Sequence, residues 1–507
     1  MMKRRYVKVL ILFVIGTGIC QSQSRYDHNY VMGYWSYEGY KDPILQFTED
    51  AVVLKHERLA NATIITGTTM SNKEGKLIFY SNGCNIATSD HEIMENGSGL
   101  NPGRVSDDNC FDSGLGYTSG QQSMLSLPLP TSETKYIMFH DRVNIYSTPD
   151  SFGIYHDLNY TIIDMSYNDG KGKVIQKNIQ ILSDTIVGSG NITAVKHSNG
   201  VDWWVIKQDF QFTNKYYKIL VTADNVLLNE EQNIGKTWFD DGGSQASFSA
   251  DGTKYFRFSR FDGLYIMDFD RATGVFSNFK GLATSVEGLF VGACFSPNGR
   301  FIYLGNGPSL YQVDLEEDTL SADLVAEWDG FIGNNLGQPT YFGMMQTGPD
   351  CRIYMHTGYC LEYMHIIMKP DEKGIACDVR QRALKFDTPV CNIPHFPNYR
   401  LDTPYDYCNP DVVVLTGTND IITSSDRNAK MIITPNPSSG NFLITAPDKI
   451  DNILVTDING RTVNTINNIS DMTYSFDGQS LSPGIYIIKV TGLNDQVEWV
   501  SKIVKID

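Results

Sequence analysis

The sequence has 507 residues, of which 41% are hydrophobic and 20% are charged, so the chain can bury a large core and is not intrinsically disordered. This length suits one large fold followed by a smaller one. The formal net charge of −17 argues against a general nucleic-acid-binding protein, because phosphate binding requires clustered lysine and arginine. With 28 Tyr, 25 Phe and 44 Gly, the composition favours an all-β protein with many turns.

Residues 1–20 have the three parts of a secretory signal peptide. A basic run precedes an apolar core at residues 7–15, and Gly18 and Cys20 have the spacing of a cleavage site. A membrane anchor is the alternative, but the apolar stretch is too short to cross a bilayer. A lipidated Cys20 is a further alternative, although Ile19 stands where a small residue is expected. No later segment reaches the roughly 18 apolar residues of a transmembrane helix.

Eight cysteines follow the signal peptide, and an even number in an exported chain indicates disulfides. Cys84 and Cys110 are the only two in the first part of the main domain, so we expect them to pair. The others are expected to cross-link the end of that domain; they are Cys294, Cys351, Cys360, Cys377, Cys391 and Cys408. Zinc is the alternative, but no C-x-x-C pair is present and no histidine has ligand spacing from two cysteines.

Residues 26–410 consist of short alternating apolar and polar runs separated by Gly, Asn and Asp, a pattern typical of strands and turns. One unit recurs, a tight turn followed by an aromatic strand. It occurs at residues 72–80, 131–139, 197–205, 249–258, 296–304 and 348–355. Units of ~40–60 residues with several strands are typical of β-propeller blades. We therefore predict a β-propeller with seven blades, six or eight being the alternatives. A β-sandwich array would not require aromatic strands at steady spacing.

The pattern from Asn82 to His140 resembles a group of exported propeller-like proteins from Bacteroidetes bacteria, and so does the later run QPTYFGMMQTGPDCRIYMH. The resemblance spans most of residues 26–410. It implies a fold and an extracytoplasmic location, and it brings no catalytic residue with it.

Residues 411–430 become polar and lose aromatic side chains, which predicts a linker. Residues 431–507 then carry three motifs in order, ITPNPSSGNFLI, VTDINGRTV and LSPGIYIIKV. The two prolines of the first motif forbid helix, and Asn459-Gly460 in the second favours a hairpin turn. These features predict a small β-sandwich.

The three motifs together are similar to the type A C-terminal sorting domain of the type IX secretion system. The residues on its motif positions are Pro435, Asn436, Pro437, Gly440, Asp457, Gly460, Arg461, Gly484, Tyr486 and Lys502. The resemblance implies handling by the type IX machinery, passage across the outer membrane, removal of the module, and surface attachment or release of the rest. A plain immunoglobulin-like module would explain the strands but not the three motifs together.

No local catalytic motif is found. The sequence has no H-E-x-x-H, no G-x-x-x-x-G-K-[ST], no G-x-S-x-G and no D-x-D-x-D-G pattern, so we assign no catalytic residue and no cofactor. His140 is a candidate for the rim of the propeller, a hydrogen-bonded interior histidine being the alternative. Asp107, Asp108 and Asp112 flank Cys110 and form a weak candidate calcium site, with a solvated acidic loop as the favoured interpretation.

Residues 231–238 approach the Asp-box turn of sialidase-type propellers, but Glu231 replaces the serine and the turn occurs once, so it indicates structure rather than activity. The pairs Trp203-Trp204 and Trp238-Phe239 are candidates for stacking on sugars. Alternate residues of a strand normally pack between sheets, so we expect at least one member of each pair in the core.

Three functions are compatible with the sequence. The first is a non-catalytic surface propeller that binds a polysaccharide or a protein through loops at one end. The second is a secreted hydrolase or lyase with carboxylates or histidines around the central channel. The third is a structural component for adhesion or motility, because a fold alone does not define a function. The absence of catalytic motifs favours the first.

Overall fold

The architecture is taken from a computed structural model of the full chain. It describes residues 24–33, 41–49, 51–60, 67–112, 116–117, 119–148, 151–187, 190–209, 212–238, 244–284, 291–333, 337–401, 413–416, 420–422, 432–434, 438–457, 461–492 and 498–505. The predicted signal peptide, most of the predicted linker, Phe239, Cys408 and four motif residues lie outside these ranges; the motif residues are Pro435, Asn436, Pro437 and Gly460. Within the described ranges, no helix is both long and apolar enough to cross a membrane.

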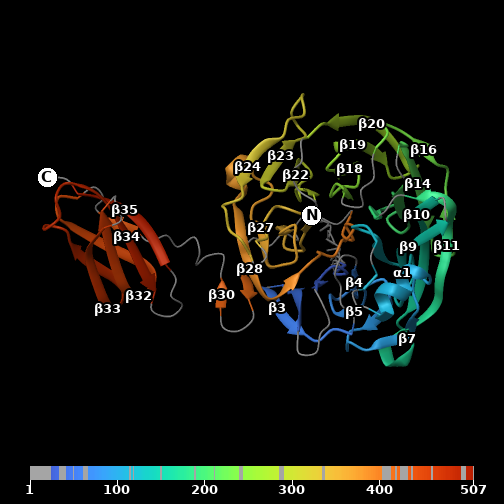
Figure 1. Ribbon diagram of the computed structural model, residues 1–507, viewed down its shortest axis with the longest axis horizontal. Helices are drawn as coiled ribbons and strands as arrows, with labels where there is room; N and C mark the ends of the chain where they lie inside the picture. Colours follow the sequence, from blue (N-terminus) through green and yellow to red (C-terminus); the bar gives the residue numbers. More distant parts are fainter. Residues whose placement is uncertain are drawn as a thin grey trace, which may run out of the picture.

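The protein is all-β, as the composition predicts. The described helical segments are single turns or little more, namely α1 (Arg104–Ser106), η1 (Asp107–Asp112), η2 (Asn168–Gly170) and η3 (Gly374–Cys377). The described strands form seven hydrogen-bonded sheets, of which six surround a common centre (Figure 1).

The first sheet contains β1 (Asn29–Val31), β2 (Asp42–Phe47), β3 (Ala51–Glu57), β29 (Val413–Thr416) and β30 (Asp420–Ile422). The second contains β4 (Thr68–Ser71), β5 (Leu77–Ser81), β6 (Asn85–Thr88), β7 (Ile93–Ser98), β8 (Met124–Pro128), β9 (Lys135–Thr148), β10 (Ser151–Asp164) and β11 (Lys173–Val187). This second sheet consists of two antiparallel runs, β4–β7 and β8–β11, which meet at the parallel pair Lys173 and Glu95.

The next four sheets are antiparallel meanders. The third sheet contains β12 (Thr193–Lys196), β13 (Trp203–Gln208), β14 (Lys215–Val221), β15 (Val226–Leu228) and β16 (Gln232–Asn233), and the fourth contains β17 (Gln245–Phe248), β18 (Lys254–Ser259), β19 (Gly263–Asp270) and β20 (Val275–Leu282). The fifth contains β21 (Gly292–Phe295), β22 (Phe301–Asn306), β23 (Ser309–Asp314) and β24 (Asp323–Glu327). The sixth contains β25 (Met345–Thr347), β26 (Ile353–His356), β27 (Leu361–Ile367) and β28 (Val379–Val390). Each recurring unit of the sequence supplies the turn into a second strand, which is β5, β9, β13, β18, β22 or β26.

The second strands of the ring's meanders, such as β13, β22 and β26, are buried on both faces, which explains their aromatic content. In β13, Trp203 and Val205 belong to one core cluster, whereas Trp204 and Ile206 belong to the next. Because successive side chains of a strand point to opposite faces, one strand contributes to the packing on both sides of its sheet. Both members of the Trp203-Trp204 pair are therefore core residues.

The last sheet contains β31 (Ile432–Thr434), β32 (Asn441–Asp457), β33 (Thr462–Asp477), β34 (Gly484–Gly492) and β35 (Glu498–Lys505). It has its own core, which includes Phe442, Ile453 and Phe476. Its strands belong to one hydrogen-bonded sheet, so the predicted sandwich stays a prediction.

The structure corrects the linker prediction for residues 411–430. The segment Val413–Thr416 forms β29, which runs parallel to β3 in the first sheet of the ring. Its valines and leucine favour a strand despite the polar residues around them. The ring therefore extends into the segment that composition assigns to a linker.

The structure contains a disulfide between Cys84 and Cys110, the pair that the sequence singles out, and another between Cys360 and Cys391. Cys351 is also disulfide-bonded. Cys294 and Cys377 are buried free thiols, which corrects their prediction as disulfide candidates. Both lie in one apolar cluster and pack there as small hydrophobic side chains.

Candidate ligand-binding platform

The chain that follows β28 is bonded to the inner part of the ring. Residues 391–401, which we call the channel segment, make hydrogen bonds to residues in or next to the first strands of several sheets. Gln122 donates to His395 Nδ1 over 2.8 Å, and Tyr399 donates to the Ser126 carbonyl over 2.6 Å. The Phe396 N–H donates to the Gln346 side chain over 3.1 Å. Burial lowers the pKa of His395 to about 3, so this histidine is neutral at physiological pH.

The channel segment ends in a buried ion pair. Arg400 donates from both terminal nitrogens to the two carboxylate oxygens of Asp27, each over 2.6 Å, and both residues are buried. Burial alone would raise the pKa of Asp27, but the charge of Arg400 and hydrogen bonds from His28 and Arg400 hold it well below its usual range. The remaining cavity here is small, about 70 Å³.

His140 lies inside the molecule rather than at a rim. Its Nδ1 is 2.6 Å from Asn101 Oδ1 and its Nε2 is 2.9 Å from Thr161 Oγ1, and the residue is fully buried. Burial lowers its pKa to about 3. A neutral histidine with two hydrogen-bond partners has a structural role, so His140 is the hydrogen-bonded interior histidine that the sequence offered as the alternative to a rim residue.

Two of the three carboxylates in the acidic loop around Cys110 are described. Asp107 and Asp108 are exposed within η1, and Asp108 Oδ2 lies 3.6 Å from Arg104 Nε. Among the described residues, no group of three His, Cys, Asp or Glu side chains is placed to hold a metal. The side chain of Asp112 lies outside the described ones, so the calcium site stays a prediction.

The turn that resembles an Asp box is structural in its contacts. Glu231 Oε2 lies 3.5 Å from Lys215 Nζ, and a Cβ on Gly235 would lie 2.4 Å from the ring of Phe279. Trp238 is 1% exposed, with the Arg257 guanidinium 5.2 Å from its ring centre. This tryptophan is therefore unavailable for stacking on a sugar at the surface.

Partly exposed aromatic rings gather elsewhere, on the long connection between β24 and β25 and on the chain at the start of β27. We call this group the aromatic platform, and it consists of Trp328, Phe331, Tyr341, Tyr359 and Tyr363. The ring centres of Trp328 and Tyr341 are 5.2 Å apart, those of Tyr341 and Tyr359 are 6.4 Å apart, and those of Phe331 and Tyr363 are 5.3 Å apart. Phe331 is 37% exposed and its neighbour Ile332 is 45% exposed.

The connection packs tightly onto the strands below because glycines leave room for its backbone. A Cβ on Gly292 of β21 would lie 2.2 Å from the Gly343 carbonyl oxygen, so only glycine permits this approach. The Phe342 N–H donates to the Gly307 carbonyl over 2.8 Å. Trp328 Nε1 donates to the Phe331 carbonyl over 3.0 Å, which closes the near end of the connection.

A charged pair lies within the platform. Arg382 of β28 donates from Nη1 to Asp329 Oδ1 over 2.9 Å and from Nη2 to Asp329 Oδ2 over 2.5 Å. Its guanidinium carbon is 4.4 Å from the ring centre of Phe331. Hydrogen bonds from Arg382 lower the pKa of Asp329, so this carboxylate is ionised at neutral pH. Side-chain exposures of 20% for Arg382 and 40% for Asp329 leave the pair open to solvent.

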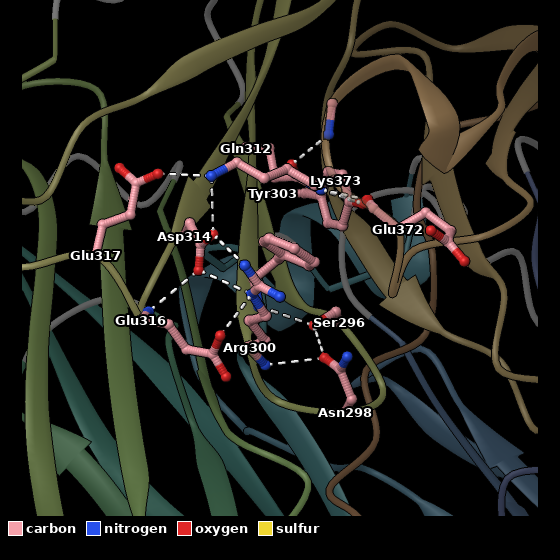
Figure 2. A network of polar contacts seen from close by, with 12 residues as sticks. Ser296, Asn298, Arg300, Tyr303, Gln312, Asp314, Glu316, Glu317, Glu372 and Lys373 are labelled. Atoms are coloured by element: carbon pink, nitrogen blue, oxygen red, sulfur yellow. Dashed lines mark hydrogen bonds and ion pairs between the residues drawn. The ribbon is translucent and has the colours of Figure 1, made fainter.

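The two sheets that carry the platform are clamped together away from it by a second network of charges (Figure 2). Asp314 of β23 accepts from Arg300 over 2.7 and 3.0 Å and from Lys373 over 3.1 Å. Hydrogen bonds from Arg300 and Lys373 hold the pKa of Asp314 well below its usual range. Lys373 precedes η3 and also pairs with Glu317 over 2.6 Å. These ion pairs favour a rigid platform, because they fix the two sheets that carry it relative to each other.

A larger groove of about 980 Å³ lies beside the turns at the start of the second strands of several sheets. Its aromatic lining includes Tyr136, Trp203 and Tyr399, which are 3%, 1% and 2% exposed. These rings pack edge to face with one another or with Tyr26. They therefore offer little free surface to a ligand, and we place the candidate site at the platform instead.

Sequence reasoning missed the platform, although a signal is present. Residues 328–344 join two strands by an unusually long stretch that alternates Gly and Asn with aromatic residues. Long connections in a fold of short turns are often functional. Tyr359, Tyr363 and Arg382 come from other elements, and only the fold brings them to this connection.

The described chain is all-β, with a ring of sheets and a separate C-terminal sheet. Residues 433–506 match the secretion system C-terminal sorting domain, so the last sheet is this domain. Gly440, Asp457, Arg461, Gly484, Tyr486 and Lys502 lie within this range and are described, and their assignment to the motif positions stays a prediction. The domain marks the chain for export to the cell surface or the extracellular space through the type IX secretion system.

The solved structures that match the chain include a candidate 6-phosphogluconolactonase from Bacteroides fragilis, with 11% identity and a TM-score of 0.41 over 75% of this chain and 99% of that one. PorZ, a surface component of the type IX secretion system of Porphyromonas gingivalis, has 10% identity and a TM-score of 0.26 over 92% and 69%. The extracellular domain of a two-component system from B. thetaiotaomicron has 11% identity and a TM-score of 0.29 over 94% and 70%. No curated protein matches the chain by sequence.

Proposed function

We propose that this protein binds an extracellular polymer, polysaccharide or protein, without cleaving it, after delivery by the type IX secretion system. The observation that carries the proposal is the aromatic platform, where five partly exposed or exposed rings gather and the ring of Phe331 lies against the Arg382–Asp329 ion pair. Rings of this kind bury large apolar area with little loss of conformational entropy, so they are effective anchors for a ligand.

The architecture we infer for the ring is a seven-bladed β-propeller. The two runs of the second sheet, β4–β7 and β8–β11, count as separate blades, and β1–β3 with β29 form the blade that closes the ring. With these assignments, a signal peptide at residues 1–20 precedes the propeller, and the sorting domain follows it.

The bonded polar groups of the channel segment support binding over hydrolysis. A hydrolase or lyase built around the centre would require carboxylates or histidines open to a substrate. Arg400, Asp27 and His395 are instead engaged with each other or with the walls of the ring. Structural adhesion remains a special case of binding, in which the partner is a matrix component.

Two experiments test the proposal. The purified exported protein, with its disulfides intact, is incubated with polysaccharides and matrix proteins, and mass spectrometry follows both retained protein and released fragments. We expect retention without fragments, whereas fragments or no retention would overturn the proposed binding role. Deletion of residues 431–507 should leave the chain in the periplasm, and unchanged surface display would contradict the delivery route.

A further inference from the structure

The backbone at Arg382 is unusual for its residue type. Arg382 lies at a register shift between β27 and β28, with a φ of 53°. Three other outer strands of the ring, β7, β11 and β20, have register shifts with a residue in the same conformation, and there the residues are Asn96, Asn178 and Asn278, with φ values of 58°, 56° and 52°. Asparagine tolerates this left-handed conformation better than arginine does. A strained residue at a β-bulge is a signal of function, because bulges redirect side chains.

The bulge directs the guanidinium of Arg382 to the platform. The Arg382 N–H donates to His365 Nδ1 over 2.9 Å, which holds the backbone of the bulge in place. Burial lowers the pKa of His365 to about 4, so its ring is neutral and can accept this bond. The side chain then reaches Asp329, the ring of Phe331 and, over 3.4 Å, Thr340 Oγ1.

We propose that the platform binds a neutral polysaccharide, whose sugar rings stack on the aromatic side chains while the Arg382–Asp329 pair binds neighbouring hydroxyl groups. The inference rests on the proposed function and adds the class of ligand. Arginine carries five N–H donors, and the bonds to Asp329 and Thr340 use three of them. The pair can therefore donate and accept at once, as vicinal hydroxyls require.

The charge of the site favours neutral ligands over acidic ones. The Arg382 charge is already balanced by Asp329, and an acidic sugar would compete with this carboxylate for the guanidinium. The formal net charge of −17 also repels a polyanion at a distance. A protein partner fits less well, because the cores of protein interfaces are depleted of charged residues and here an ion pair lies among the rings.

The test compares the exported protein with Arg382→Asn, which places at this bulge the residue type found at the bulges of β7, β11 and β20, so the backbone is preserved. Binding is measured by affinity electrophoresis and calorimetry against soluble neutral glucans, xylans and mannans, and against alginate and polygalacturonate. We expect binding to a neutral polymer that changes little between low and high salt, since no charge is neutralised. Arg382→Asn should weaken it at least tenfold without lowering the unfolding midpoint.

The outcomes separate this inference from the proposed function. Binding to the acidic polymers alone, binding only to a protein, or equal binding by Arg382→Asn would overturn the inference and leave the proposed function in place. Release of fragments from a bound neutral polymer would overturn the proposed function and leave the preference for neutral sugars standing. A second variant, Phe331→Ala, tests the stacking surface separately from the ion pair.

Discussion

Two bidentate arginine–aspartate pairs in this protein have the same chemistry and different surroundings. Arg400 and Asp27 are 7% and 4% exposed at the end of the channel segment, whereas Arg382 and Asp329 are 20% and 40% exposed in the aromatic platform. A buried pair cannot lose one partner without leaving an uncompensated charge, but a partly exposed pair can exchange a partner for water. The comparison shows that burial, rather than the residue types, separates a structural ion pair from one that can meet a ligand.

The largest difference between the two ion pairs should appear in the free energy of unfolding when the arginine of each pair is replaced. Arg400→Met leaves the Asp27 carboxylate buried and unpaired, so we expect the free energy of unfolding to fall by about 3–5 kcal/mol. The matched change Arg382→Asn should alter it by less than about 1 kcal/mol. Denaturant titration of the disulfide-intact proteins measures both, and equal losses would contradict the comparison.

A disulfide joins the two regions, since Cys360 follows Tyr359 of the platform and Cys391 begins the channel segment. Replacing both cysteines by serine should cost about 3 kcal/mol of unfolding free energy and also weaken ligand binding. The control replaces Cys84 and Cys110, whose sequence separation of 26 is close to the 31 of the first pair. This control replacement should cost a similar unfolding free energy and leave ligand binding unchanged. If the control variant also lost binding, the weaker binding of the first variant would result from general destabilisation.

Acid should weaken the buried pair. The pKa of Asp27 is lower in the folded protein than the value of about 3.9 in an unfolded chain, so its stabilising contribution is complete above that pH and is lost as the pH falls. We expect about 2 kcal/mol of unfolding free energy to disappear between pH 5 and pH 2, and Arg400→Met should lack this part of the loss. Urea titrations at several pH values measure it, and parallel curves for the two proteins would refute the assignment.

The smallest expected effect concerns the platform alone. Phe331→Ala removes a ring that is 37% exposed, so binding should weaken about tenfold, or about 1.4 kcal/mol, with little change in stability. Phe212→Ala is the control, because Phe212 is 73% exposed but lies away from the platform. Equal effects of both variants on binding would locate the ligand elsewhere on the ring.

The sequence alone determined the class of fold, the position of every recurring turn, the disulfide partner of Cys84 and the sorting domain. These features depend on local chemistry: tight turns require Asn-Gly or Asp-Gly, and core strands require alternating large side chains. A motif whose residues lie close together in the sequence, such as each motif of residues 433–506, can be recognised without knowledge of the fold.

Tertiary structure alone decided what the channel segment contacts, which of the described cysteines stay free, and which side chains meet in the aromatic platform. Trp203 and Trp238 are prominent in the sequence and buried in the fold, whereas Phe331 and Arg382 are inconspicuous and meet at the surface although 51 positions separate them. Burial and pairing are properties of contacts between distant segments, and a local pattern carries little information about which segment will cover a given side chain.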